Sequence, residues 1–212
     1  MRELSITGNT IQAVPTEGGR NILLIGNNET MNKLGLLSIT GNHISNHTVN
    51  IELQNIRGIS ITGNTFVRGY DRHIIAKNCQ NLIISSNVLD HNDDYFPLEL
   101  VTKGGIIMEK IKNVIICDNI IQGVEHLGAI ELYGGNNISV SSCHIIDHLY
   151  QGIRIKDCSE LSINGCIIKR IKQDSDEIIQ SEIYLTGKCE NISINNTLLA
   201  SGFKTNLYNW NY

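Results

Sequence analysis

Short segments in which apolar and polar residues alternate recur along the whole chain. The clearest is Leu-Ser-Ile-Thr-Gly-Asn, which begins at Leu4 and again at Leu37. Related copies follow, beginning at Ile59, Leu82, Val114, Ile138, Leu161 and Ile192. Alternation with a period of two predicts a β-strand, in which Leu4 and Ile6 point to one side and Ser5 points to the other.

The spacing of these copies predicts how they are arranged. They begin 33, 22, 23, 32, 24, 23 and 31 residues apart, so a basic repeat of 22 or 23 residues carries three insertions. A second short strand precedes most copies, a third follows the Gly-Asn turn, and no segment has the period of a helix. Repeats of this kind predict an all-β, single-stranded parallel β-helix of about eight coils. Equivalent strands of successive coils are expected to stack about 4.8 Å apart.

One turn position of the repeat holds asparagine in the first five coils. We expect these amides to stack in one column and to hydrogen-bond from coil to coil; they belong to Asn9, Asn42, Asn64, Asn87 and Asn119. Cys143, Cys166 and Thr197 continue the column. Free cysteine packs as a small buried side chain, which is the expected role of Cys143 and Cys166. Because they would lie in adjacent coils, a disulfide between them is the alternative.

The Ile-x-Ile-x-x-Asn coils resemble those of the pectin-lyase-like superfamily over nearly the whole chain. The resemblance is greatest to its carbohydrate-binding and sugar-hydrolase repeat proteins. It implies that the helix is right-handed and that the ligand is a polysaccharide or oligosaccharide. Because the repeat itself is structural, the resemblance is specific for the fold and does not define an activity.

A shorter segment resembles the polygalacturonases. Gly-Ile-Arg-Ile-Lys, at residues 152–156, is similar to the Arg-Ile-Lys substrate-binding strand of that family. His-Leu-Gly, at residues 126–128, is loosely similar to the His-Gly motif of the same family. The family also needs Asn-Thr-Asp and Asp-Asp motifs on preceding strands. Those strands here carry His73, Ile75 and Lys77, then Gly105, Ile107 and Glu109. The catalytic acids of the polygalacturonases therefore have no counterparts in this chain.

Side chains suited to chemistry gather on the first strands of neighbouring coils. There Ile130 and Ile153 point inward, so Glu131 and Arg154 point outward. The candidate catalytic residues are Glu131, Arg154, Lys156 and His126. The candidate substrate-binding residues are Asp93, Asp94, Glu109, Tyr133, His148 and Tyr184. Two insertions, Asp90–Lys103 and Lys169–Ser181, would rise beside this face as the walls of a cleft.

These groups allow two kinds of reaction. Paired carboxylates would serve glycoside hydrolysis as acid and base. A lyase would instead use Arg154 or Lys156 to neutralise the carboxylate of a uronate while a base removes the adjacent proton. Simpler roles stay open, since Glu131 and Arg154 are opposed in adjacent coils and would form a surface ion pair. The histidines would then be ordinary loop residues.

The composition narrows the function classes. The net charge is −4 and the 17 basic residues form no tract, which argues against a nucleic-acid partner. No apolar run is long enough to cross a membrane. None of the six cysteines forms a Cys-x-x-Cys motif, so we predict no metal site. Two functions remain: a polysaccharide lyase or glycoside hydrolase, and a non-catalytic carbohydrate-binding, adhesin or tail-fibre module. No cofactor is indicated, and only the analogy of fold favours an extracellular or cell-surface location.

The two ends of the helix are expected to differ. Residues 1–200 would form the coils, and residues 201–212 would lie across the last coil as an aromatic cap containing Phe203, Tyr208, Trp210 and Tyr212. The chain enters the repeat at Leu4, which leaves no room for a cap on the first coil, and an open strand edge invites association. We therefore expect a homo-oligomer or a missing N-terminal segment at that end.

Overall fold

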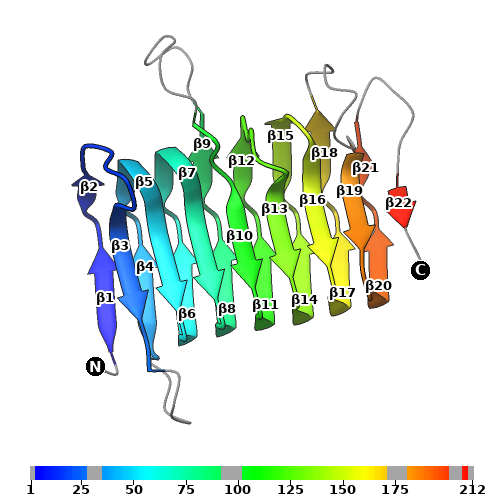
Figure 1. Cartoon of the computed structure of the whole chain (residues 1–212), viewed down its shortest axis with the longest axis horizontal. Helices are drawn as coiled ribbons and strands as arrows, with labels where there is room; N and C mark the ends of the chain where they lie inside the picture. The colour runs from blue at the N-terminus through cyan, green and yellow to red at the C-terminus, as the bar shows by residue number, and fades with distance from the viewer. Residues whose placement is uncertain (1–2, 28–34, 92–101, 171–180, 201–206, 210–212) are drawn as a thin grey trace.

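The computed structural model describes residues 3–27, 35–91, 102–170, 181–200 and 207–209. These residues form strands joined by turns, and the strands coil repeatedly along one axis from the N-terminus towards the C-terminus (Figure 1). Every strand pairing in this part of the chain is parallel, which confirms the parallel β-helix predicted from the repeat. No helix among these residues has the length and apolar character needed to cross a membrane.

One sheet, which we call sheet A, contains the eight copies of the alternating motif, one from each coil. Its strands, in order, are β1 (Leu4–Thr7), β4 (Leu37–Thr40), β6 (Arg57–Thr62), β8 (Gln80–Ser85), β11 (Lys112–Cys117), β14 (Asn136–Ser141), β17 (Ser159–Asn164) and β20 (Glu190–Asn195). The copies pair in the predicted register: Leu4 lies beside Leu37, and Ile116 lies beside Val140.

The second sheet, sheet B, has two branches. Branch 1 follows the asparagine turn and contains β2 (Thr10–Gln12), β9 (Val88–Asp90), β12 (Ile120–Gln122), β15 (His144–His148), β18 (Ile167–Arg170) and β21 (Leu198–Leu199). Branch 2 precedes the next copy of the motif and contains β3 (Arg20–Ile25), β10 (Ile106–Glu109), β13 (Gly128–Tyr133), β16 (Gln151–Lys156), β19 (Ser181–Thr186) and β22 (Leu207–Asn209). Two long strands, β5 (His43–Gln54) and β7 (Thr65–Lys77), run through both branches and join them.

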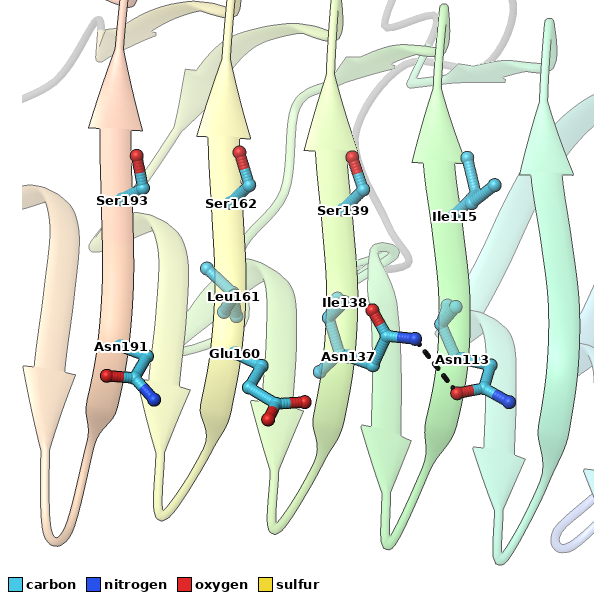
Figure 2. A pocket seen from close by; sticks show the side chains of 11 residues that line it. Asn113, Ile115, Asn137, Ile138, Ser139, Glu160, Leu161, Ser162, Asn191 and Ser193 are labelled. Atoms are coloured by element: carbon cyan, nitrogen blue, oxygen red, sulfur yellow. Dashed lines mark hydrogen bonds between the residues drawn. The ribbon is translucent and has the colours of Figure 1, made fainter.

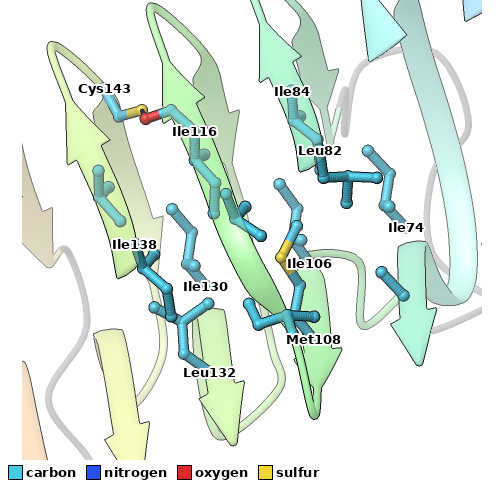
Figure 3. Close-up of a cluster of buried hydrophobic side chains, with 14 of the residues drawn as sticks. Ile74, Leu82, Ile84, Ile106, Met108, Ile116, Ile130, Leu132, Ile138 and Cys143 are labelled. Carbon is cyan, nitrogen blue, oxygen red and sulfur yellow. Dashed lines mark hydrogen bonds between the residues drawn. The ribbon is translucent and has the colours of Figure 1, made fainter. Parts of the chain in front are cut away.

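The core lies between the sheets. The inward residues of sheet A, such as Ile84 and Ile116, are fully buried, and so are those of branch 2, such as Ile106 and Ile130. Figure 3 shows these side chains meeting inside the coils. The same column positions recur from coil to coil, so along strands of sheet A such as β11 and β14 fully buried side chains alternate with more accessible ones, as the sequence pattern predicted. At the two ends of the column, Ile6 and Ile194 are only partly buried.

The asparagine column follows the turn between sheet A and branch 1. Asn42, Asn64 and Asn87 each donate a side-chain hydrogen bond to the asparagine of the next coil at 3.0 Å. Each also donates to a main-chain carbonyl, as Asn87 does to Ile61 at 2.9 Å. The amides therefore fill their hydrogen-bonding capacity inside the turn, and the residues from Asn42 to Asn119 in the column are about 1% exposed.

The column continues through cysteines, which are free. Cys143 and Cys166 are 0% and 1% exposed, as expected of small buried side chains. The alternative expectation of a disulfide between them is wrong, since neither thiol is bonded to another. The aromatic cap predicted for residues 201–212 falls outside the described residues, apart from strand β22, which extends branch 2 beyond β19.

Candidate functional site

The outward side chains of branch 2 fall into the rows predicted from the sequence. One row crosses β10, β13, β16 and β19 through Ile107, Glu131, Arg154 and Tyr184. A second row, one pleat further along the strands, runs through Glu109, Tyr133, Lys156 and Thr186. The candidate residues that lie on these strands therefore share one face, the outer face of branch 2.

Glu131 is buried despite its place on this outer face, with 2% of its surface exposed. Its Oε1 atom accepts hydrogen bonds from Arg72 Nη2 at 2.8 Å and from the Gly128 amide at 3.1 Å. Its Oε2 atom accepts a hydrogen bond from the Tyr133 hydroxyl. The expected ion pair between Glu131 and Arg154 is therefore wrong. The carboxylate turns instead to Arg72, which reaches it from β7, two strands away.

Arg72 connects Glu131 to a histidine and a second carboxylate. Its Nη2 atom lies 2.6 Å from His126 Nδ1, and because a guanidinium only donates, the proton of the neutral imidazole belongs on Nε2. That nitrogen faces Asp71 Oδ1 at 3.4 Å. The hydrogen bond from His126 is the largest influence on Asp71 and lowers the pKa of its carboxyl group. Burial lowers the pKa of Arg72, and the charge of Glu131 opposes that shift.

Tyr133 is a hydrogen-bond donor in this network. Burial and the hydrogen bond to Glu131 raise the pKa of its phenol to about 12, although the nearby charge of Arg154 acts in the opposite direction. The hydroxyl therefore stays protonated near neutral pH. We call Asp71, Arg72, His126, Glu131, Tyr133 and Arg154 the Arg72–Arg154 cluster.

Arg154 is held from both sides and keeps one free donor. Its Nη1 atom donates to Gln151 Oε1 at 2.8 Å, and its guanidinium carbon lies 5.0 Å from the ring centre of Tyr184. Its Nε atom is buried and has no hydrogen-bond partner, and the same is true of Nη1 of Arg72. The Arg72–Arg154 cluster thus contains two guanidinium groups, each with an unused buried donor.

The other two predicted residues on these strands lie at the margin of the cluster. Lys156 is exposed and pairs in register with Tyr133. Glu109 is half-buried and lies in register between Lys77 and Tyr133. Neither side chain forms an ion pair with any residue that the structure describes. Both are therefore free to contact a ligand on this face.

His148 does not join the outer face. It is 1% exposed, and its imidazole occupies space beside Gly152, where an added Cβ would lie 3.3 Å from His148 Nε2. Burial lowers the pKa of His148 to about 3, and the charge of Arg170 acts in the same direction. His148 ends strand β15, so the alternative expectation of an ordinary loop residue is wrong, and its burial leaves it unable to contact a ligand as predicted. Of the two predicted histidines, only His126, with 24% of its side chain exposed, is part of the cluster.

Asp93 and Asp94 lie outside the described residues, together with residues 95–101 and 171–180 of the two insertions. The cleft with these insertions as its walls therefore stays a prediction. Within the part of the chain that is described, no three histidine, cysteine, aspartate or glutamate side chains are grouped so that they could hold a metal ion.

The comparison with known proteins identifies the family. Residues 101–211 match the family described as the right-handed β-helix region, which is about half of the chain. The chain belongs to this family. No curated protein matches the sequence of this right-handed β-helix protein.

Two solved structures show the same fold. One is titled as a putative glycosyl hydrolase from Parabacteroides merdae; it is 15% identical, with a TM-score of 0.53, and the match covers 76% of this chain and 81% of that one. The other is an alginate lyase from a Paenibacillus species; it is 10% identical, with a TM-score of 0.52, over 92% of this chain and 86% of that one. At these identities the likeness concerns the fold.

Two residues of this β-helix protein's cluster, Asp71 and Arg72, were not predicted from its sequence, and neither was Gln151, which accepts a hydrogen bond from Arg154. Register alignment finds contacts between adjacent coils, but Arg72 passes over β10 to reach β13. The available signal was the run Tyr-Asp-Arg-His at residues 70–73, which breaks the apolar pattern just before the core segment of β7.

Proposed function

We propose that the outer face of branch 2 binds an acidic polysaccharide through Arg72 and Arg154. The observation that supports this is the pair of buried N–H groups, Arg72 Nη1 and Arg154 Nε, that have no partner. A buried donor without an acceptor costs about 1–3 kcal/mol, and more when the group is charged. Because both atoms are buried, the two side chains must shift to expose them, and a carboxylate on a bound sugar would then supply acceptors of the right charge.

The charges of the cluster favour an anionic ligand. The carboxylate of Glu131 is already bound by Arg72, the Gly128 amide and Tyr133. Arg154 has no carboxylate partner among the described residues, so in this part of the chain no ion pair neutralises its positive charge. The exposed ammonium of Lys156 adds a second positive charge on the same face.

The shape of the face favours a chain of sugars over a small molecule. The rows of branch 2 repeat at about 4.8 Å from strand to strand, so they offer successive contacts along the helix axis. Tyr184 is half-buried, and a sugar ring can pack on the part of its ring that is accessible. The solved structures of similar fold are titled as a glycosyl hydrolase and an alginate lyase, which is consistent with a polysaccharide ligand here.

If the face also cleaves its ligand, the geometry favours elimination over hydrolysis. Hydrolysis needs a carboxyl group placed to donate a proton to the ligand, but both oxygens of Glu131 already accept hydrogen bonds from Arg72, the Gly128 amide and Tyr133. In elimination, Arg154 or Lys156 would neutralise the carboxylate of a uronate, and His126 would remove the adjacent proton with Nδ1 once the ligand draws the Arg72 guanidinium away from that nitrogen. The electrons of the broken C–H bond form a carbon–carbon double bond, the bond to the leaving sugar oxygen breaks, and that oxygen takes a proton from Tyr133. Glu131 is then a positioning residue that holds Arg72 and Tyr133.

Binding is tested by titrating the protein with oligosaccharides of alginate and of polygalacturonate at low salt. Arg154→Gln should weaken the affinity at least tenfold, because a hydrogen bond to a charged group contributes about 1.5–3 kcal/mol. Lys112→Gln is the matched control, since it removes one exposed charge from sheet A and should leave the affinity unchanged. Equal affinities of the wild type and Arg154→Gln would refute the site.

Cleavage is tested with the same oligosaccharides by the ultraviolet absorbance of an unsaturated uronate. The reaction should be lost in His126→Ala, which removes the base, while binding persists. Saturable binding without any product would identify a non-catalytic carbohydrate-binding module.

A further inference from the structure

The outer face of sheet A carries a groove that is separate from the Arg72–Arg154 cluster. It has a volume of about 460 Å³ and crosses β11, β14, β17 and β20 (Figure 2). One row along it is in register from strand to strand and contains Ile115, Ser139, Ser162 and Ser193. The row beside it contains Asn113, Asn137, Glu160 and Asn191. The core of the helix lies between this groove and the outer face of branch 2.

The groove contains polar atoms that are not used within the protein. Asn137 donates to Asn113 at 3.0 Å, and Asn113 donates to Asn81 at 2.8 Å. The amide chain ends at Asn137, because the next coil has Glu160 in this position, so Asn137 Oδ1 is an open acceptor. In the described part of the chain, the Ser139 hydroxyl has no partner either.

The hydroxyl of Ser162 and the amide of Asn191 are likewise without a side-chain partner among the described residues. Ser139 and Ser162 are adjacent in register, so their hydroxyls point from the same face of neighbouring strands. Together with Asn137, these residues offer donors and acceptors on three consecutive strands, which span two strand spacings or about 10 Å. A ligand with hydroxyl groups at regular intervals can use them all.

The charge and the apolar end of the groove identify the ligand class more closely. No lysine, arginine or histidine lines the groove, and its one charged side chain is Glu160, so an acidic chain is disfavoured. At the other end, Ile115 is 43% exposed, and its register neighbour Ile83, on β8 beyond the groove lining, is 41% exposed. Such a surface matches the C–H face of a sugar ring, and the serine row matches its hydroxyl groups.

We propose that this groove binds a neutral oligosaccharide that lies across the strands of sheet A. The site is independent of the acidic-polysaccharide site on branch 2. The chain would then carry two sugar-binding faces of different charge preference on opposite sides of one core.

The test uses the full chain, labelled with nitrogen-15, and neutral hexasaccharides of glucose and of mannose as probes. We expect saturable shifts of the amide signals of Ser139, Ser162 and Asn191, with an acidic hexauronate giving none at these residues. The absence of saturable shifts in the groove at millimolar concentrations of every neutral probe would overturn the proposal.

The double variant Ser139→Val plus Ser162→Val removes the two hydroxyls and keeps residues that suit a strand. It should weaken binding of the neutral probe by about tenfold, since two hydrogen bonds are lost. Ser60→Val, in the same row on β6 but outside the groove, is the matched control and should bind as the wild type does. Equal unfolding temperatures show that the loss is not a loss of fold.

Two further outcomes would overturn the proposal in distinguishable ways. If Arg154→Gln abolishes binding of the neutral probe, the sugar binds at branch 2 and not in the groove. If light scattering shows a dimer that the double serine variant converts to a monomer, the occupant of the groove is a second copy of this chain. If the acidic ligand does not bind at branch 2 but the neutral probe still binds in the groove, only the branch 2 proposal is refuted.

Discussion

Removal of the Glu131 carboxylate tests the buried network most directly. Glu131→Ala leaves the guanidinium of Arg72 buried, at 4% exposure, without its 2.8 Å partner. Breaking a buried ion pair on one side destabilises a protein by about 3–5 kcal/mol, because the remaining charge is desolvated and unpaired. Tyr133 loses its acceptor in the same substitution, so we expect a value in the upper part of that range.

The assay is urea unfolding followed by circular dichroism, with the free energy taken from the midpoint while the slope stays unchanged. For a chain of this length, the expected loss corresponds to a fall in Tm of roughly 6–20 °C. Glu160→Ala is the control, since its carboxylate is exposed on sheet A and its removal should change stability by no more than about 0.5 kcal/mol.

A double variant separates the ion pair from other effects of the substitution. Arg72→Met combined with Glu131→Leu removes both charges and fills the space with apolar atoms, so most of the lost stability should return. The reasoning is refuted if Glu131→Ala is as stable as Glu160→Ala, or if the double variant is less stable than Glu131→Ala alone.

Three further substitutions test the core, the ladder and the buried histidine. Ile116→Ala should lower the free energy of unfolding by about 2–5 kcal/mol because it leaves a cavity, whereas Ile115→Ala, on the same strand but 43% exposed, should cost far less in the same urea assay. Asn87→Ala removes hydrogen bonds to Asn64, Asn119 and the Ile61 carbonyl and should cost at least about 2 kcal/mol by urea unfolding. His148 has a pKa of about 3 in the folded protein, below its ordinary 6.5, so the folded state binds fewer protons than the unfolded state and stability falls as the pH drops from 6.5 towards 3. His148→Leu should therefore reduce the pH dependence of the free energy of unfolding by up to about 1.4 kcal/mol per pH unit. Scans of Tm against pH measure the effect, and identical slopes in variant and wild type would contradict it.

The fold could be predicted because the repeat constrains the register. A shift of one residue in any copy of the motif would move residues such as Ile61 and Ile84 from the core to solvent. The fixed position of asparagine in the turn gives a second, independent marker of register. Both constraints act between adjacent coils, which is the range over which a sequence alignment of repeats is informative.

The candidate site was predicted only in part, for a related reason. The rows that hold Glu131, Arg154 and Tyr184 follow from the register, but their contacts depend on the segment that precedes branch 2. That segment differs in length from coil to coil, and it positions Arg72 and buries His148. The direction of a long side chain in a segment that does not repeat is decided by packing, which has no periodic signature in the sequence.

The two outer faces differ in how regular they are, and this difference predicts how each would hold a sugar chain. On sheet A the outward row repeats serine in β14, β17 and β20, so each strand spacing offers the same contact. A repeating chain can slide by one sugar and still fit, so the affinity of neutral oligosaccharides should rise with chain length while no single register is preferred. On branch 2 the row changes at every coil, from Glu131 to Arg154 to Tyr184. An acidic chain there meets a different group at each step, so one register is selected, and only a ligand held in one register can present its reacting atoms to His126.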